Sequence, residues 1–206
     1  MRARTPTVFV VDDDGAVRSS LRLLLKSVGL AVATFDSAQT FLDSHSEQSV
    51  GCVLLDVRMP GMSGPVLQQQ LTRCGSVLPV IFITGHGDVS MAVEAMQQGA
   101  FDFIEKPFHD QELLERVHRA LEKDALVRGQ LSEHQAIRER FDSLTPRARE
   151  VLDQVTRGSS NKVMAYDLRI SQRTIEIHRS RIMEKMEAPS LAHLVRMTLS
   201  VTAPAR

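Results

Sequence analysis

Short apolar runs alternate with helical patterns from residue 7 to about residue 121, and this alternation constrains the fold more than any other feature. Each run is rich in β-branched residues and apolar almost throughout, which is typical of a strand buried on both faces. Strands of this kind separated by amphipathic helices form a parallel sheet that helices cover on both sides. Right-handed crossovers then favour a doubly wound α/β fold. The predicted strands are residues 7–11, 31–35, 52–55, 79–83 and 101–104.

The second part of the chain has a different pattern. Residues 122–142 are polar, poor in glycine and proline, and thinly set with apolar residues, so we predict a helical linker. Beyond it, only residues 169–171 separate two helical patterns, a spacing typical of a helix-turn-helix. We therefore predict an α/β domain over 1–121, the linker, and a small all-α domain over 143–206. The helices predicted in that small domain are residues 145–157, 162–168, 171–186 and 190–201.

Charge is distributed unevenly along the chain. The totals are 25 Lys and Arg against 25 Asp and Glu, a formal net charge of +0. Residues 1–120 hold 10 basic and 14 acidic residues, whereas residues 143–206 hold 11 basic and 6 acidic ones. The basic C-terminal part favours a polyanionic partner. There is no apolar stretch long enough for a membrane span, no signal-like segment and no disulfide framework, so we expect a cytoplasmic protein that does not bind membranes.

Polar side chains stand where four of the predicted strands end: Asp12 and Asp13, Asp56, Thr84, and Lys106. Because the carboxyl ends of parallel strands meet at one edge of a sheet, we expect these side chains to share a crevice. Clustered carboxylates need a hard cation, and oxygen ligands favour Mg²⁺ or Mn²⁺. A cation beside Asp56 lets its carboxylate act as a nucleophile toward phosphorus. Thr84 and Lys106 would then hold the oxygens of the transferred group.

Neighbouring residues have simpler explanations. Asp14 precedes a helical pattern and is more typical of an N-cap than of a metal ligand. A solvated loop position explains His86 better than a catalytic role does, and an effect on the lifetime of the phosphoryl group is a minor hypothesis. Cys52 lies in a predicted buried strand, where we expect it only to pack.

Residues 5–121 resemble a response-regulator receiver domain of two-component signalling. The resemblance implies a five-stranded flavodoxin/CheY-like fold in which Asp56 accepts phosphate from a phosphohistidine of a sensor histidine kinase. It implies that Asp13, Asp56 and the backbone oxygen of Arg58 bind Mg²⁺ directly, while Asp12 helps through water. The motifs that carry the resemblance are Val10–Asp14, Leu55–Gly64, Thr84–Asp88 and Glu105–Phe108.

The same resemblance implies a switch pair. Thr84 would turn toward the phosphoryl group while Phe103 rotates inward. Phenylalanine stands where tyrosine is usual, so no outward hydroxyl contact is available. The peptide bond from Lys106 to Pro107 is expected to be cis, which only a bond before proline adopts at low energy.

The third predicted helix of the basic domain has two contrasting faces. Ser171 is suited to cap it, and Ile175, Ile182 and Met186 are spaced for one inward face. The opposite face carries Ile177 among polar residues, which suits a surface that reads base edges, thymine methyl groups included. The spacing alone also fits an alternative to DNA binding, in which these helices form a small bundle for dimerisation. The predicted DNA-binding residues are Arg173, Thr174, Glu176, Ile177, His178, Ser180, Arg181 and Lys185.

Residues 143–201 are similar to the LuxR/FixJ-type helix-turn-helix, and a receiver followed by this module resembles FixJ-like regulators over nearly the whole chain. The chain departs from that pattern at several positions. Ala148 replaces a usual Glu, so the reciprocal capping box is missing. Ser159 replaces a usual Leu, and Arg169 and Glu187 stand where Gly is common and are strained if φ is positive. The matching segments are 144–147, 149–152, 160–162, 171–179, 185–186 and 190–195.

The combined resemblance implies a transcription regulator, not an enzyme, that a sensor histidine kinase phosphorylates on Asp56. Phosphorylation is expected to favour a homodimer through residues 89–98 and 101–104. Its recognition helices would meet half-sites of double-stranded promoter DNA about one turn, ~10 bp, apart or a multiple of it. RNA polymerase is a candidate partner. The alternatives are an aspartyl-phosphate phosphatase or phosphotransferase, a phosphorelay module whose bundle binds protein, and RNA antitermination, for which stacking aromatics are missing.

Overall fold

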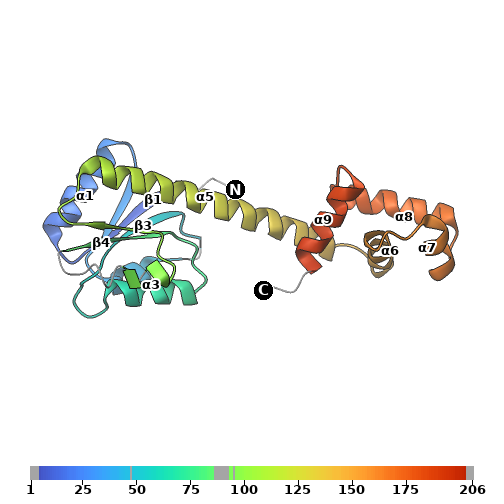
Figure 1. Cartoon of the computed structure of the whole chain (residues 1–206), viewed down its shortest axis with the longest axis horizontal. Helices are drawn as coiled ribbons and strands as arrows, with labels where there is room; N and C mark the ends of the chain where they lie inside the picture. The colour runs from blue at the N-terminus through green and yellow to red at the C-terminus, as the bar shows by residue number, and fades with distance from the viewer. Residues whose placement is uncertain (1–4, 47, 86–92, 95, 203–206) are drawn as a thin grey trace. The chain divides into compact units, whose positions relative to one another are not determined.

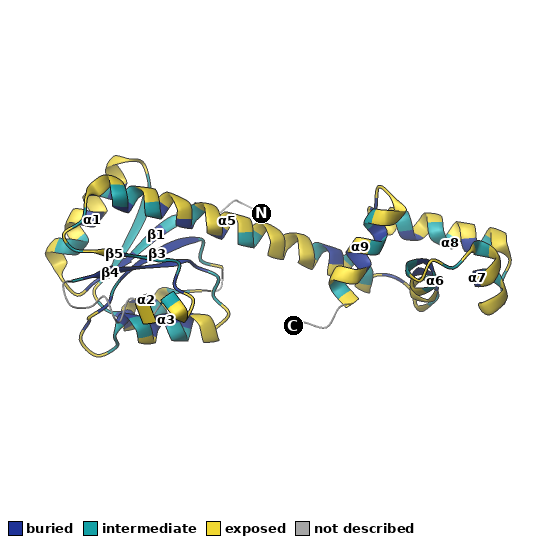
Figure 2. Ribbon diagram, in the orientation of Figure 1, coloured by how far each residue is buried: buried dark blue, intermediate teal, exposed yellow. Residues whose placement is uncertain are grey.

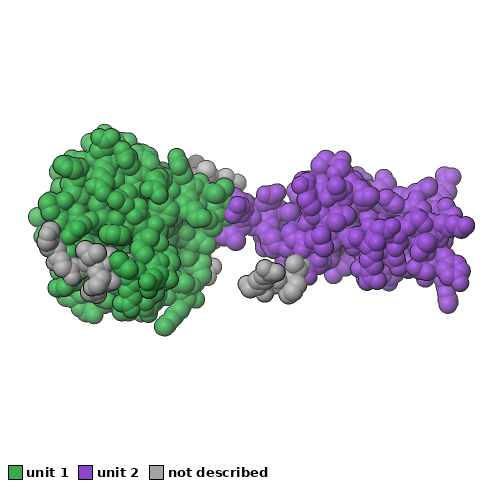
Figure 3. All heavy atoms as spheres, viewed as in Figure 1, with its two compact units in different colours: residues 1–128 green, residues 129–206 purple. Residues whose placement is uncertain are grey.

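The computed structural model describes residues 5–46, 48–85, 93–94 and 96–202 of a chain that divides into two compact units (Figures 1 and 3). Unit 1 is Met1–Arg128 and unit 2 is Gly129–Arg206. Across the described ranges, none of the helices combines the length and the apolar character of a membrane-spanning segment.

Unit 1 is built on a five-stranded sheet in the order β2-β1-β3-β4-β5. All neighbouring strands are parallel. The order reverses between the first and third strands, which is where ligands of such sheets bind. This topology confirms the predicted doubly wound α/β fold, and each strand lies within one residue of its predicted run. The strands are β1 Thr7–Val11, β2 Ala31–Phe35, β3 Gly51–Asp56, β4 Val80–Thr84 and β5 Asp102–Glu105.

Helices cover both faces of the sheet: α1 Gly15–Ser27, α2 Ala38–Ser44, α3 Gly64–Arg73 and α5 Asp110–Asp142. On one face, Leu25 of α1 and Val117 of α5 pack in one buried cluster with strand residues such as Ile81. On the other face, Phe41 of α2 and Leu67 of α3 pack with the remaining strand side chains. Figure 1 shows the two layers, with α1 and α5 on one side of the sheet and α3 on the other. Because all five strands are parallel, their carboxyl ends meet at one edge of the sheet.

Helix α5 runs without a break for 33 residues, so the predicted linker is helical throughout. Its Asp124 is buried, with 1% exposure, and accepts a hydrogen bond of 3.0 Å from the backbone N–H of Gly51. The Nε of Arg128 donates to both carboxylate oxygens of Asp124, at 2.8 and 3.0 Å, and its Nη2 donates to the carbonyl of Ser49. The packing of unit 1 therefore continues past residue 121, as far as Arg128.

Gly51, at the start of β3, stands where a side chain would collide with β1. Its φ is +136°, and a Cβ there would lie 1.8 Å from the carbonyl oxygen of Thr7. The next residue, Cys52, is fully buried, and burial, reinforced by the Asp124 carboxylate, raises the pKa of its thiol to about 12. The thiol therefore stays protonated and packs as an apolar group, as predicted.

Unit 2 packs its helices around a single apolar core, with the end of α5 contributing Ile137. Ile175, Ile182 and Met186 have 0%, 1% and 0% exposure, which confirms the predicted inward face of the third helix. The hydroxyl of Ser171 accepts the backbone N–H of Thr174 at 3.0 Å and caps that helix. The helices are α6 Pro146–Thr156, α7 Asn161–Asp167, α8 Gln172–Lys185 and α9 Leu191–Thr202.

The departures from the usual helix-turn-helix pattern have visible consequences. Thr145 still caps α6 by accepting the N–H of Ala148 at 3.2 Å, so half of the capping box is kept. Ser159 is half-buried and bonds through its hydroxyl to Gln154 at 2.7 Å. Arg169 and Glu187 adopt φ values of 53° and 51°, so the condition under which strain was expected is met at both positions. A side chain in that region is disfavoured by about 1–2 kcal/mol.

We expect Arg169→Gly to stabilise unit 2 by about 1 kcal/mol. Glycine removes the Cβ strain, and the greater freedom of the unfolded chain offsets part of the gain. Arg169→Ala is the matched control, because it removes the guanidinium but keeps the Cβ. Scanning calorimetry of the full chain should show a raised melting temperature for the glycine variant alone. Equal melting temperatures of the two variants would mean that the change in stability comes from loss of the arginine side chain and not from relief of backbone strain.

Candidate functional site

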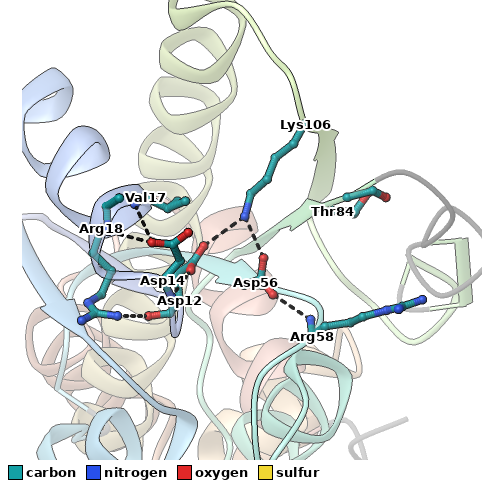
Figure 4. A network of polar contacts seen from close by, with 10 residues as sticks. Asp12, Asp14, Val17, Arg18, Asp56, Arg58, Thr84 and Lys106 are labelled. Carbon is teal, nitrogen blue, oxygen red and sulfur yellow. Dashed lines mark hydrogen bonds and ion pairs between the residues drawn. The ribbon is translucent and has the colours of Figure 1, made fainter.

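An ammonium joins two carboxylates at the carboxyl edge of the sheet of unit 1 (Figure 4). Lys106, just after β5, donates from Nζ to Oδ2 of Asp12 at 3.2 Å and to Oδ1 of Asp56 at 2.9 Å. Asp12 is 1% exposed, and Asp56 ends the buried strand β3. The peptide bond from Lys106 to Pro107 is cis, as predicted. The strand topology thus brings together three of the predicted site residues.

Backbone and side-chain groups hold Asp12 in place. The N–H of Asp14 donates to Oδ1 of Asp12 at 2.8 Å, and Nη1 of Arg18 donates to the carbonyl oxygen of Asp12 at 2.6 Å. The side chain of Asp14 accepts the N–H groups of Ala16 and Val17, so this residue is the predicted N-cap of α1. The sequence reasoning missed Arg18, and only its position on the first turns of α1 could have indicated it.

The second oxygen of Asp56 is held from the loop that follows β3. The backbone N–H of Arg58 donates to Oδ2 of Asp56 at 2.8 Å. Gly64, at the start of α3, donates its N–H to the carbonyl of Val57 at 3.0 Å, and a Cβ there would lie 2.3 Å from the backbone oxygen of Asp56. Glycine is therefore needed for α3 to begin directly behind Asp56.

The electrostatic environment of the pair follows from its partial burial. Burial raises the pKa of the Asp56 carboxyl, and the Asp12 carboxylate adds to this, against the opposite influence of Lys106 and of the Arg58 N–H. Burial works to lower the pKa of Lys106, but the hydrogen bonds and charges of Asp56 and Asp12 outweigh it, so the pKa is raised. The ammonium is thus a lasting positive charge beside the Asp56 oxygens.

Among the described residues, the side chains at the other predicted positions of this edge form no hydrogen bond or ion pair with the side chains of Asp56 or Lys106, and each has its own surroundings. Thr84 is fully buried at the end of β4, and its Oγ1 lies 3.4 Å from the carbonyl oxygen of Gly85. Phe103 of β5 is half-buried and packs against the apolar cluster beneath α2 and α3. Asp13 is exposed beside Asp12. His86 lies outside the described residues.

The donor atoms suit a hard divalent cation. Asp12 and Asp56 already direct oxygens toward one positive charge, and Asp13 adds an exposed carboxylate next to them. All of these donors are oxygens, which Mg²⁺ and Mn²⁺ prefer. Among the described residues, however, no three His, Cys, Asp or Glu side chains converge as in a preformed metal centre. The residues therefore fit such a cation in chemistry, while the Lys106 ammonium supplies the positive charge between Asp12 and Asp56.

Many residues of helix α8 in unit 2 are exposed to solvent (Figure 2). Arg173, Glu176, Ser180 and Arg181 are exposed, and Ile177 is 45% exposed. The apolar Ile177 thus stands among charged and polar neighbours, opposite the buried face. A solvent-facing helix of this composition is suited to the edges of base pairs in a major groove.

The remaining predicted DNA-binding residues take part in contacts within unit 2. The hydroxyls of Thr174 and Ser171 lie 2.8 Å apart, and Nζ of Lys185 donates to the carbonyl of Ser143 at 3.0 Å. His178 is half-buried and lines a hollow against the start of α6. Arg179, a further basic residue of this helix, donates to Oδ1 of Asn161 at 2.6 Å. The eight predicted residues therefore divide into a solvent face and a flank that packs on neighbouring helices.

Two family models match the chain. Residues 8–118 match the response regulator receiver domain, and residues 142–198 match the bacterial regulatory proteins of the luxR family. The matched ranges correspond to the sheet with its covering helices and to the helices of unit 2.

Curated relatives cover almost the full length. The response regulator protein TodT of Pseudomonas putida is 43% identical over 198 residues, covering 96% of this chain and 87% of the relative. The transcriptional regulatory protein FixJ of Azorhizobium caulinodans is 47% identical over 192 residues, covering 93% of this chain and 91% of the relative. FixJ of Rhizobium meliloti is 47% identical over 194 residues, with 94% and 95% covered.

Solved structures agree. The response regulator StyR superposes with a TM-score of 0.87 at 46% identity, covering 95% of this chain and 98% of StyR. Full-length FixJ from B. japonicum superposes with a TM-score of 0.60 at 42% identity, covering 98% of this chain and 100% of that structure. With an acidic sheet edge in unit 1 and a helix-turn-helix in unit 2, the chain belongs to the two-component response regulators that join a receiver domain to a LuxR-type DNA-binding domain.

Proposed function

We propose that this chain is a transcription regulator whose binding to promoter DNA is controlled by phosphorylation of Asp56. The observation that carries the proposal is the shared contact of Lys106 with Asp12 and Asp56, which leaves a carboxylate at a sheet edge beside a fixed positive charge. The same chain carries a helix whose exposed face mixes charged, polar and apolar side chains. A sensor histidine kinase is the expected phosphoryl donor.

In the proposed transfer, an Asp56 oxygen attacks the phosphorus of a phosphohistidine. The new O–P bond forms as the N–P bond breaks, and the imidazole leaves with the bonding electron pair. In this proposal Lys106 neutralises charge on the phosphoryl oxygens, and the hydroxyl of Thr84, at the end of the neighbouring strand β4, would turn toward them. Transfer of this kind depends mainly on positioning and charge stabilisation.

Asp12, Asp13 and Asp56, with the backbone oxygen of Arg58, would hold the divalent cation. When bound, Mg²⁺ or Mn²⁺ would offset the negative charge that the oxygens of the phosphoryl group add to a carboxylate-rich edge. Chelation by EDTA is therefore expected to suppress phosphorylation of Asp56 by acetyl phosphate. Restoration of labelling by Mg²⁺, and no comparable restoration by K⁺, would support an oxygen-bound divalent ion.

Phosphorylation is proposed to act by shifting a population toward a dimer. The proposed contact uses residues 101–104, together with 93–94 and 96–98 among the described residues of the preceding helix; residues 86–92 and 95 lie outside the described ranges. Two copies would present two α8 helices to half-sites about one turn, ~10 bp, or a multiple apart. RNA polymerase is a further proposed partner.

Selection of genomic DNA by the full chain tests this function. The protein is incubated with Mg²⁺ and with or without acetyl phosphate, and bound fragments are sequenced. We expect enriched sites with two related half-sites and a several-fold rise in affinity on phosphorylation. Absence of any enriched DNA in both states would contradict the proposal and favour a phosphorelay module. Turnover of small phosphomonoesters by the intact protein would favour the phosphatase alternative.

Binding to an enriched site should weaken steeply with salt. Each DNA phosphate neutralised by Lys or Arg releases a counterion, so about four such contacts would lower affinity roughly 100-fold between 50 and 200 mM salt. The excess of basic residues in 143–206 supplies the charge. Fluorescence anisotropy with labelled DNA measures the slope. A flat salt dependence would mean that phosphate contacts do not supply the affinity.

A further inference from the structure

The contacts within unit 2 leave a small part of α8 for direct contact with base edges. Arg179 bonds to Asn161 at 2.6 Å, and Lys185 bonds to the carbonyl of Ser143 at 3.0 Å. Thr174 interacts with the cap residue Ser171 at 2.8 Å. These side chains tie α8 to the end of α5, to α7 and to its own first turn. They are suited to hold the helix and to meet phosphates, not to enter a groove.

Several side chains of α8 that take no part in these contacts are exposed, and three of them, Arg173, Glu176 and Ile177, lie in the first half of the helix. Arg173, Glu176, Ile177 and Ser180 share the exposed side, at spacings of three and four residues. The first half of a recognition helix is also the part that enters the major groove. Three chemically different groups, those of Arg173, Glu176 and Ile177, therefore occupy the part of the helix from which bases are read.

Glu176 is the most informative of these residues. A carboxylate on a DNA-facing surface is repelled by phosphates, and unit 2 otherwise carries an excess of basic residues. In the major groove a carboxylate has a favourable partner only in an exocyclic amine, such as N4 of cytosine. The carbonyl oxygens O6 of guanine and O4 of thymine would repel it at the same position. Glu176 is thus suited to reject bases as well as to accept one.

Arg173 and Ile177 flank that carboxylate on the exposed side. An arginine in the groove pairs through two donors with O6 and N7 of guanine, and an aliphatic side chain packs on the thymine methyl. Residues four apart are separated by about 6 Å along the helix axis, which is close to two base steps. A helix in the groove can therefore bring Arg173 and Ile177 to different bases of the same half-site.

We propose that Arg173 reads a guanine, Glu176 a cytosine and Ile177 a thymine within one short segment of each operator half-site. This inference rests on the proposed DNA-binding function and names the bases that the function would recognise. The structural basis is the division of α8 into a tethered flank and a solvent face.

The test is DNA selection with the phosphorylated full chain, repeated with variants of single residues. Arg173→Ala should relax the preference at one guanine about 10- to 100-fold, with other positions unchanged. Glu176→Gln should change the preferred base at one position from cytosine to adenine, because an amide pairs with adenine N6 and N7. Glu184→Gln is the matched control: Glu184 is exposed on the same helix but lies in its last turn, and its substitution should leave the base profile unchanged.

Removal of a single methyl group tests Ile177. Replacing the selected thymine by deoxyuridine should weaken binding of the natural chain several-fold and should not further weaken an Ile177→Ser variant. Lys185→Ala should lower affinity for all sequences by the same factor and leave the base profile unchanged.

If the phosphorylated natural chain enriches no sequence, the proposed function fails, and this inference fails with it. If a site is enriched but Arg173→Ala and Glu176→Gln keep its base preferences, the DNA-binding function stands and the base assignment is overturned. Circular dichroism of each variant shows whether the helices are retained, as expected for substitutions at exposed positions.

Discussion

Asp56→Asn should reduce phosphoryl incorporation from acetyl phosphate to background. The amide has no anionic oxygen to attack phosphorus, and it weakens the ion pair with Lys106 that spans 2.9 Å. Lys106 keeps its contact with Asp12, and the amide oxygen of the substituted side chain can still accept the Arg58 N–H, so the local fold should persist. Phosphate-affinity gels or intact-mass spectrometry measure the incorporation.

Asp14→Asn is the matched control for that variant. Asp14 lies two residues from Asp12 and is also acidic, but its side chain caps α1 by accepting the N–H of Ala16 at 2.8 Å. Asparagine caps helices about as well as aspartate, so this variant should be labelled like the natural chain. Persistent labelling of the Asp56 variant at another residue would refute the assignment of the phosphoacceptor.

Asp124→Ala should destabilise unit 1 by about 3 kcal/mol. The substitution removes the acceptor of the Gly51 N–H and both contacts with Arg128, at a position with 1% exposure. An unsatisfied buried N–H costs about 1–3 kcal/mol, and breaking one side of a buried ion pair costs about 3–5 kcal/mol. The Arg128 side chain keeps partial access to water, so we expect a loss of free energy of unfolding near the lower end of the range for a broken ion pair. Urea denaturation of the full chain measures it.

Two further variants make that measurement specific. Glu122→Ala removes an exposed carboxylate from the same stretch of α5 and should change the free energy of unfolding by less than about 0.5 kcal/mol. Asp124→Asn keeps an oxygen that can accept the Gly51 N–H. Its free energy of unfolding should therefore fall between those of the Asp124→Ala and Glu122→Ala variants. Equal stability of the Asp124→Ala and Glu122→Ala variants would show that the buried contacts do not hold α5 to the sheet.

The fold and the centre of the acidic site could be predicted from residues in their local setting. Apolar periodicity indicated each strand, and the alternation with helices implied a parallel sheet. Asp12, Asp56 and Lys106 were then expected together because parallel strands end at the same edge, although Lys106 and Asp12 lie 94 positions apart. The cap role of Asp14 followed from its place before α1. The family resemblance marked Arg169 and Glu187 as positions where Gly is common, and the structure shows that both have a positive φ.

Other features depended on how side chains meet in three dimensions. Nothing in the pattern of residues 122–142 indicates that Asp124 is buried against Gly51, 73 positions away. Likewise, Arg179 is one of several basic residues on α8. Its hydrogen bond to Asn161 sets it apart from the others, and that bond depends on the packing of α7 against α8. The bond from Arg18 to the carbonyl of Asp12 is a third example.

The difference has a physical origin. Strand and helix periods, caps and topology follow from backbone geometry and from the burial of apolar faces, and these are written into short stretches of the chain. The choice of one arginine or carboxylate among several depends on which side chain reaches a partner when the elements close against one another. That choice is made by packing, so the amino-acid order specified the architecture and the acidic edge of the sheet, whereas folding selected the residues that hold α5, Asp12 and α8 in position.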